Sequence, residues 1–181
     1  NSFDEIIEIG AVKTDEEYRE IDGFRRLIRP AIYRKMNPYI QKILSITMKD
    51  LQNEEPLQAV AKAFFDWCGD CDTLIAWSGN DFGVLEKNLA HIGMEVPKRL
   101  NRYDVQMAYS YRTEKSIRNY ALKTAVEAME LPEPEDQAYH DAYCDAQFTA
   151  AIGRALTERY GPLPTTEELD AYYDEHKDEL D

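Results

Sequence analysis

Residues 5–13 (EIIEIGAVK) constrain the fold most strongly, because a nearly continuous apolar run rich in Ile and Val lies close to the start of the chain. A run of this length that ends in charges predicts a buried strand. Residues 24–29 (FRRLIR) predict a second strand that returns beside the first across a polar turn, and Pro30 ends it. The chain is therefore expected to begin with an antiparallel meander.

Helices and single strands alternate after this meander. Apolar residues at helical spacing predict a helix over residues 57–67, and residues 72–77 (DTLIAW) predict a short buried strand. We expect a further strand at residues 102–105, a helix capped by Ser116 and a long helix over residues 136–160. This order predicts an α/β domain in which helices flank a mixed sheet, in a ribonuclease-H-like arrangement.

The length of 181 residues fits one domain that can bury a core without disulfides. We assign residues 1–160 to this domain, and residues 161–181 to a Gly-Pro-Leu-Pro hinge followed by an acidic C-terminal helix. The odd number of cysteines, the lack of a signal-peptide pattern and the lack of a membrane-length apolar run favour the cytoplasm.

The charge is unevenly distributed. A net charge of −14 argues against non-specific binding of nucleic acid. Half of this negative charge lies in residues 165–181. We interpret this acidic segment as a surface that faces solvent. A dipolar surface can still bind phosphate locally, and the basic residues form one main cluster and a smaller one. These are Arg25, Arg26, Arg29, Arg34 and Lys35, followed by Lys98, Arg99 and Arg102.

Three side chains are candidates for chemistry. His140 precedes Asp145 by five residues near the start of the predicted long helix, and Asp81 follows the predicted strand at residues 72–77. Two carboxylates that hold a divalent ion and an imidazole that accepts a proton can together hydrolyse a phosphodiester. Five positions on a helix rotate by about 500°, so His140 must precede the helix or lie in its first turn to reach Asp145. The alternatives are an ordinary surface His–Asp pair and a helix N-cap at Asp81.

Residues 68–71 (CGDC) have the spacing of a redox motif. The cysteines follow a predicted helix and precede a strand, so no helix N-terminus would lower a thiol pKa. A zinc site would need two more ligands, and the sequence holds neither a second CxxC nor a His pair. We therefore expect structural or incidental cysteines.

Taken in order, four segments resemble the DEDDh family of 3′–5′ exonucleases, which contains RNase T and the proofreading subunit of DNA polymerase III. Residues 5–12 (EIIEIGAV) resemble the second strand of the family, and Ile46-Thr47 resembles the Ile-Thr after its proline-bearing loop. Asn80-Asp81 stands at the middle acidic motif, and residues 140–146 (HDAYCDA) resemble the last motif. The resemblance covers roughly residues 5–155 and is greatest to exoribonucleases that trim structured RNA ends.

The resemblance implies a metal-dependent 3′–5′ exonuclease that acts on RNA or short single-stranded oligonucleotides. It implies His140 as the catalytic base and Asp81 and Asp145 as metal ligands. Two Mg²⁺ or Mn²⁺ ions are the implied cofactors, because hard oxygen ligands favour them over zinc. The implied partners are 3′ ends of single-stranded RNA or DNA, with no membrane, and a homodimer by analogy alone.

One departure leaves alternatives open. The first family motif, Asp-x-Glu on a strand before EIIEIGAV, does not occur in the chain, in which Asp4 and Glu5 are adjacent. We expect this strand upstream of Asn1, because a sheet with an unfilled central position is costly. The alternatives are a catalytically degenerate nucleic-acid-binding or regulatory module of the same fold, and an unrelated α/β domain that docks partners through its acidic tail.

Overall fold

The computed structural model describes residues 3–133 and 141–180. β1 (Glu8–Thr14) and β2 (Glu20–Leu27) form the predicted antiparallel hairpin, with Gly10 opposite Arg25. β1 begins three residues later than the apolar run, because the chain before it is held by a side chain. Asn88 accepts a hydrogen bond from the Ile6 N–H at 3.0 Å and donates one to the Asp4 carbonyl at 2.8 Å.

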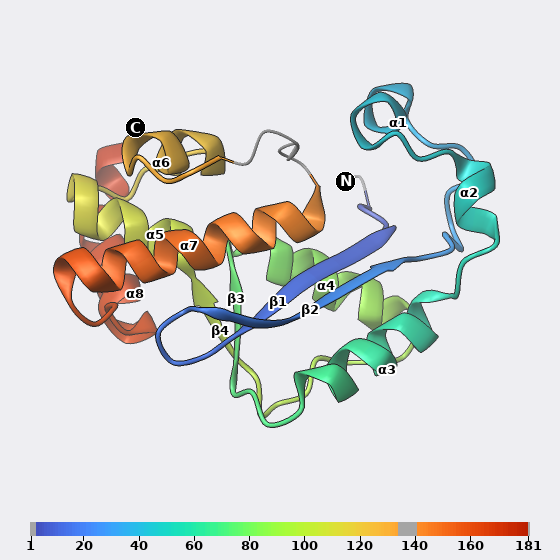
Figure 1. Ribbon diagram of the computed structural model, residues 1–181, viewed down its shortest axis with the longest axis horizontal. Coiled ribbons are helices and arrows are strands. Elements are labelled where there is room, and N and C mark those ends of the chain that lie inside the picture. Colours follow the sequence, from blue (N-terminus) through green and yellow to red (C-terminus); the bar gives the residue numbers. More distant parts are fainter. Residues whose placement is uncertain (1–2, 134–140, 181) are drawn as a thin grey trace.

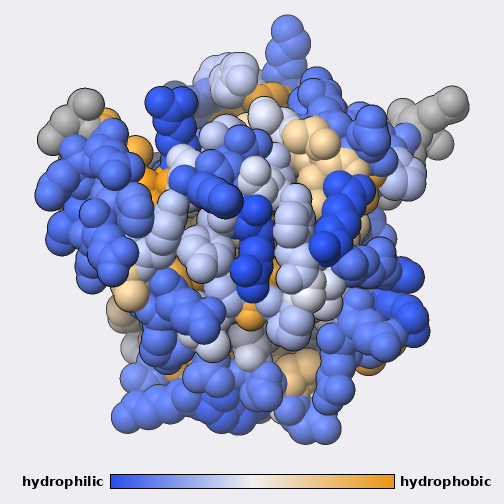
Figure 2. Space-filling model, turned by 90° about the vertical axis from the view of Figure 1, so that its left-hand side faces the viewer, coloured by the Kyte–Doolittle hydropathy of each residue, from blue (hydrophilic) through white to orange (hydrophobic). Residues whose placement is uncertain are grey.

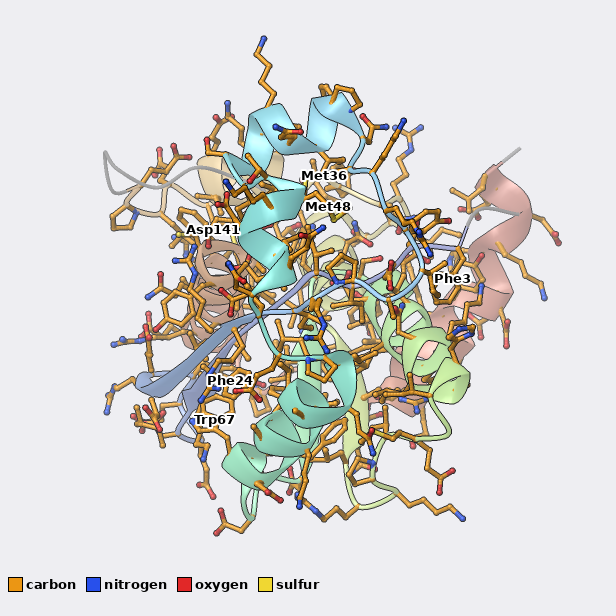
Figure 3. The ribbon with its side chains drawn as sticks, turned by 90° about the vertical axis from the view of Figure 1, so that its right-hand side faces the viewer. Phe3, Phe24, Met36, Met48, Trp67 and Asp141 are labelled. Atoms are coloured by element: carbon orange, nitrogen blue, oxygen red, sulfur yellow. The ribbon has the colours of Figure 1, made fainter. Side chains whose placement is uncertain are left out.

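The chain next leaves the hairpin through two short helices, α1 (Pro38–Leu44) and α2 (Met48–Gln52), which stand apart from the other layers (Figure 1). Thr47 caps α2 in a capping box with Asp50. α3 (Leu57–Cys68) then returns and packs against the hairpin. The rings of Phe24 and Trp67 lie 5.5 Å apart at this contact (Figure 3).

β3 (Thr73–Ala76), α4 (Asn80–His91) and β4 (Asn101–Asp104) form a parallel β-α-β unit. Within the described residues, the four strands form two separate two-stranded ladders, β1–β2 and β3–β4. The antiparallel hairpin at the start and the later parallel pair agree with the prediction. No hydrogen bonds between the four described strands join the two ladders into one continuous sheet.

The remaining elements are helical. α5 (Val105–Tyr109) continues into a π-helical turn, η1 (Ser110–Glu114). The predicted cap at Ser116 is wrong, because α6 begins only at Leu122; the Ser116 hydroxyl instead accepts a turn hydrogen bond from the Arg118 N–H at 3.0 Å. The last elements are α6 (Leu122–Ala128), α7 (Ala142–Tyr160), α8 (Thr166–His176) and η2 (Lys177–Leu180).

Two hydrophobic cores hold these elements together. One lies between the hairpin, α3 and α4 and includes the fully buried Val60 and Leu89; the other joins α5, α6, α7 and α8. Leu169 of α8 belongs to the second core, so the acidic helix packs on the domain. The face that carries α6 and α8 is mainly hydrophilic, with separated apolar patches (Figure 2). None of the described helices combines the length and apolarity needed to cross a bilayer.

Candidate active site

The carboxyl ends of β3 and β4 lie at one edge, because the strands are parallel and Ala76 pairs with Asp104. β3 leads through a short loop into α4, whose N-cap is Gly79 and whose first turn contains Asp81. The alternative in which Asp81 caps the helix is wrong, because Asp81 follows the cap by two positions. Its carboxylate therefore lies where the helix dipole favours negative charge and where α/β sheets bind ligands.

Asp104 fixes the loop that presents Asp81. Its carboxylate accepts hydrogen bonds from the Gly79 N–H at 2.9 Å and from the Met107 N–H at 3.2 Å. These bonds tie the start of α4 to the start of α5. Burial raises the pKa of the Asp104 carboxyl, and the backbone donors oppose that shift. Asp104 is not among the residues predicted from sequence, although an Asp between a short strand and a helix is a recognisable N-cap signal.

Asp81 and Asp104 form an electrostatically unfavourable pair. Burial, and then the negative charge of Asp104, raise the pKa of the Asp81 carboxyl. A divalent cation would relieve this repulsion, and carboxylate oxygens fit the chemistry of Mg²⁺ or Mn²⁺. In residues 3–133 and 141–180, no group of three or more His, Cys, Asp or Glu side chains could hold an ion. The described donors therefore have the right chemistry but supply only part of a ligand set.

The second predicted ligand, Asp145, lies in the first turn of α7 and is half-buried. Asp141 caps this helix, because its carboxylate accepts a hydrogen bond from the Cys144 N–H at 3.0 Å. Both predicted ligands thus occupy the first turn of a helix. His140, the predicted base, lies outside the described residues, and its role stays a prediction.

Two glycines of the hairpin set the position of α7. A Cβ atom on Gly10 would lie 2.4 Å from the Tyr143 backbone nitrogen, so only glycine permits this approach. A Cβ atom on Gly23 would lie 2.3 Å from the Tyr143 hydroxyl, which donates a hydrogen bond to Glu20 at 2.7 Å. The place of Asp145 therefore depends on these contacts. These contacts were not predicted from sequence, although glycine inside a strand signals close backbone approach.

An ionic link fastens the same helix end to both strands. The Arg25 guanidinium contacts Glu8 at 3.2 Å and Asp141 at 2.6 Å. Only 7% of the Glu8 side chain is exposed, and burial raises its pKa despite the opposing charge of Arg25. Arg25 was predicted only as one of the surface cations; in the structure this exposed side chain also neutralises two carboxylates.

A cavity of about 280 Å³ opens beside Asp104 and the loop before α4. The rings of Tyr111 and Tyr172 meet edge to face in its wall, with centroids 4.9 Å apart. Its lining combines aromatic rings with amides, a combination suited to a planar, hydrogen-bonding ring. Among the lining residues are Tyr111, Tyr172, Tyr173, Asn80, Gln106 and Asn119.

The cysteines have the expected structural character. Cys68, Cys71 and Cys144 are free thiols, and Cys68 is buried at the end of α3. Burial raises the pKa of the Cys68 thiol, as it does that of Cys144. Neither is activated as a nucleophile.

Comparison with known proteins gives matches at the levels of family and fold. The sequence model of the family described as RNase_T, exonuclease, matches residues 1–152. No curated protein matches the chain in sequence. A crystal structure of a full-length 3′-exonuclease superposes with a TM-score of 0.76 at 15% identity, covering 90% of this chain and 80% of that chain.

Two further solved structures are similar. The nuclease domain of 3′hExo, described as a DEDDh family member bound to rAMP, gives a TM-score of 0.75 at 18% identity, covering 91% of this chain and 86% of that chain. The zinc-bound E. coli ExoI–ssDNA complex gives 0.68 at 18% identity, covering 98% of this chain and 41% of that chain. These superpositions confirm the ribonuclease-H-like exonuclease fold.

Proposed function

Because the chain belongs to the RNase_T exonuclease family, we propose that it is a metal-dependent 3′–5′ exonuclease acting on the 3′ ends of RNA or short single-stranded oligonucleotides. The observation that carries the proposal is the placement of Asp81. Its carboxylate lies in the first turn of α4, beside a second carboxylate, and burial and this neighbour raise its pKa. A cation is the simplest ligand that such a site would take.

The roles of the chain's own residues follow from this placement. Asp81 and Asp145 would hold two divalent ions, Mg²⁺ or Mn²⁺, which when bound would activate a water molecule and stabilise the charge of the phosphate. His140 would accept the proton of the attacking water. Asp104 positions the loop before Asp81 through its hydrogen bond from Gly79.

The remaining ligands would come from the Asp-x-Glu strand expected upstream of Asn1. Hydrogen bonds do not connect the ladders β1–β2 and β3–β4 within the described residues. A strand between them would join the two ladders into one mixed sheet and bring its carboxylates toward Asp81. The similar structures support the substrate class, since their descriptions include rAMP and ssDNA.

Hydrolysis of end-labelled oligonucleotides tests the proposal. A longer chain that carries Asp-x-Glu ahead of Asn1 should shorten a 5′-labelled strand in steps and release a labelled mononucleotide first from a 3′-labelled one. Mg²⁺, Mn²⁺ and Zn²⁺ are compared, because one similar structure is a zinc-bound form. Chelation, Asp81→Asn, Asp145→Asn or His140→Ala should each abolish activity. Asp170→Asn on the exposed side of α8 is the matched control.

A catalytically degenerate nucleic-acid-binding module is the second candidate. It is favoured by one observation, that the described residues contain no complete group of metal ligands. Such a module would bind oligonucleotides equally well with and without chelator. The longer chain would then hydrolyse no oligonucleotide in the presence of Mg²⁺, Mn²⁺ or Zn²⁺. Turnover that depends on Asp81 would exclude it.

Two further expectations belong to the proposal. We place the protein in the cytoplasm, and its three free cysteines support a reducing compartment. A homodimer rests on the family analogy, and sedimentation of the purified chain tests it.

A further inference from the structure

Residues 30–55 form an arm between β2 and α3 that carries α1 and α2 outside the layered body (Figure 1). We call this segment the basic arm. Its two ends are joined, because the Arg29 N–H donates a hydrogen bond to the Glu55 carbonyl at 2.8 Å. The Glu5 carboxylate also fixes the root by accepting three backbone N–H bonds. Their donors are Ala31, Ile32 and Tyr33.

Positive charge is concentrated on the outer part of this arm. Residues 30–49 contain four Lys and Arg residues and no Asp or Glu, whereas the three acidic residues of the arm, at positions 50, 54 and 55, lie where it returns to α3. The four cations are exposed and, among the described residues, have no ion-pair partner. They are Arg34, Lys35, Lys42 and Lys49. In contrast, two of the three cations in the second cluster of the sequence are engaged internally: Arg99 donates to backbone carbonyls and Arg102 pairs with Glu86.

Exposed rings accompany these charges. Tyr39 is 69% exposed and Tyr33 is 45% exposed, and α1 buries none of its residues. Tyr39 and Lys42 are three positions apart on α1 and therefore share one face of the helix. Tyr33 adjoins Arg34 in sequence. The arm thus presents an exposed ring next to a cation at two places. In Figure 3, α1 and α2 of the arm face the viewer.

We propose that the basic arm binds the single-stranded nucleic acid that lies upstream of the 3′ end. This inference rests on the proposed function for the identity of the strand. Lys and Arg neutralise phosphates, and exposed rings stack on bases without regard to sequence. The acidic remainder of the surface repels the same strand, so the arm is the surface to which a long substrate is attracted. The acidic α8 of a second copy is a poorer occupant, because its Leu169 is already buried in its own core.

Matched charge variants test the arm. One variant neutralises four exposed cations of the arm, and the control makes the same change in net charge at four exposed cations elsewhere. The arm variant combines Arg34→Gln, Lys35→Gln, Lys42→Gln and Lys49→Gln. The control combines Lys62→Gln, Lys87→Gln, Lys98→Gln and Lys115→Gln. Both should keep the wild-type melting temperature, since the substituted side chains are exposed.

Binding is measured by fluorescence anisotropy with a 5′-fluorescein oligouridylate of about 30 nucleotides, with chelator present so that no cleavage occurs. Single strands release counterions with a slope of roughly 0.7 per neutralised phosphate. The arm variant should therefore lower the slope of log K against log salt by about 3 and weaken binding by about 10- to 100-fold near physiological salt. Tyr39→Leu should weaken binding about tenfold with the slope unchanged.

The outcomes separate the arm from the active site. Weaker binding of the long strand by the arm variant, with unchanged hydrolysis of a trinucleotide by the longer chain, supports the proposal. Equal binding by the arm variant and the control overturns it. So does a wild-type chain that binds anionic vesicles or self-associates through the arm instead of binding the oligouridylate. Arm-dependent binding without any hydrolysis would sustain the arm and remove the exonuclease proposal.

Discussion

Gly10→Ala should move the first turn of α7 and thereby disable the site. The added Cβ would lie 2.4 Å from the Tyr143 backbone nitrogen and 2.7 Å from the Ala142 carbonyl carbon. Ordinary contacts of this kind begin near 3.4 Å, so β1 and α7 must separate by about 1 Å. The obstacle is backbone on both sides, and it cannot swing away as the end of a side chain can.

The size of the effect follows from two opposing terms. Replacing a strand glycine by alanine gains roughly 0.5–1 kcal/mol from the unfolded state, whereas overpacking costs about 1–3 kcal/mol and occasionally more. The clash should dominate, because its contacts are backbone atoms, and a net loss of about 2 kcal/mol lowers the melting temperature by roughly 4–8 °C at this chain length. A displacement of Asp145 by about 1 Å should cost on the order of 100-fold in kcat.

Thermal unfolding and nucleotide release by the longer chain measure these effects. Gly83→Ala is the stability control, because its Cβ would meet nothing within 4 Å, and an alanine inside α4 should raise the melting temperature. Gly23→Ala should be milder than Gly10→Ala, since it meets only the end of the Tyr143 side chain. Unchanged stability and activity of Gly10→Ala would refute the view that this glycine sets the position of α7.

Three further predictions test other contacts. Leu169→Ala should destabilise the chain by about 2–5 kcal/mol in urea unfolding, whereas no loss would show that α8 is an independent tail. Burial raises the pKa of Glu8 above 4.5, so its native form binds the proton more tightly than its unfolded form. The melting temperature of Glu8→Gln should therefore increase relative to that of the wild type as the pH rises from about 4 to 7. If the difference between the two melting temperatures stayed constant with pH, burial would not be the cause of the raised pKa. In the longer chain, Mn²⁺ should raise the melting temperature of the wild type much more than it raises the melting temperature of Asp81→Asn. Equal increases in the two proteins would exclude Asp81 as a ligand.

Local patterns predicted much of the fold. The Ile- and Val-rich run and the helical spacing of residues 57–67 each led to an observed element, because their signals act within one turn or one strand. The cap at Ser116 failed because a serine hydroxyl stabilises a turn as readily as a helix start. The two separate ladders depend on which strand edges meet, and no local pattern encodes that.

The candidate site was less accessible to sequence reasoning. Asp81 was found through its place after a strand, but Asp104 was missed because its role depends on a loop 25 residues away. The ion pair of Arg25 with Asp141 and the contact of Gly10 with Tyr143 join segments more than 100 residues apart. Arg25 does lie on the surface, but the sequence gives no information about the two carboxylates that it contacts there.

We propose that Asp81 and Asp145 hold the same metal centre. The most direct measurement is a crystal structure of the longer chain soaked with Mn²⁺, in which anomalous scattering locates the ions. Manganese should lie within bonding distance of carboxylate oxygens from both residues, with the His140 ring beside it. Manganese bound elsewhere, or two carboxylates too far apart to share one two-ion centre, would contradict it.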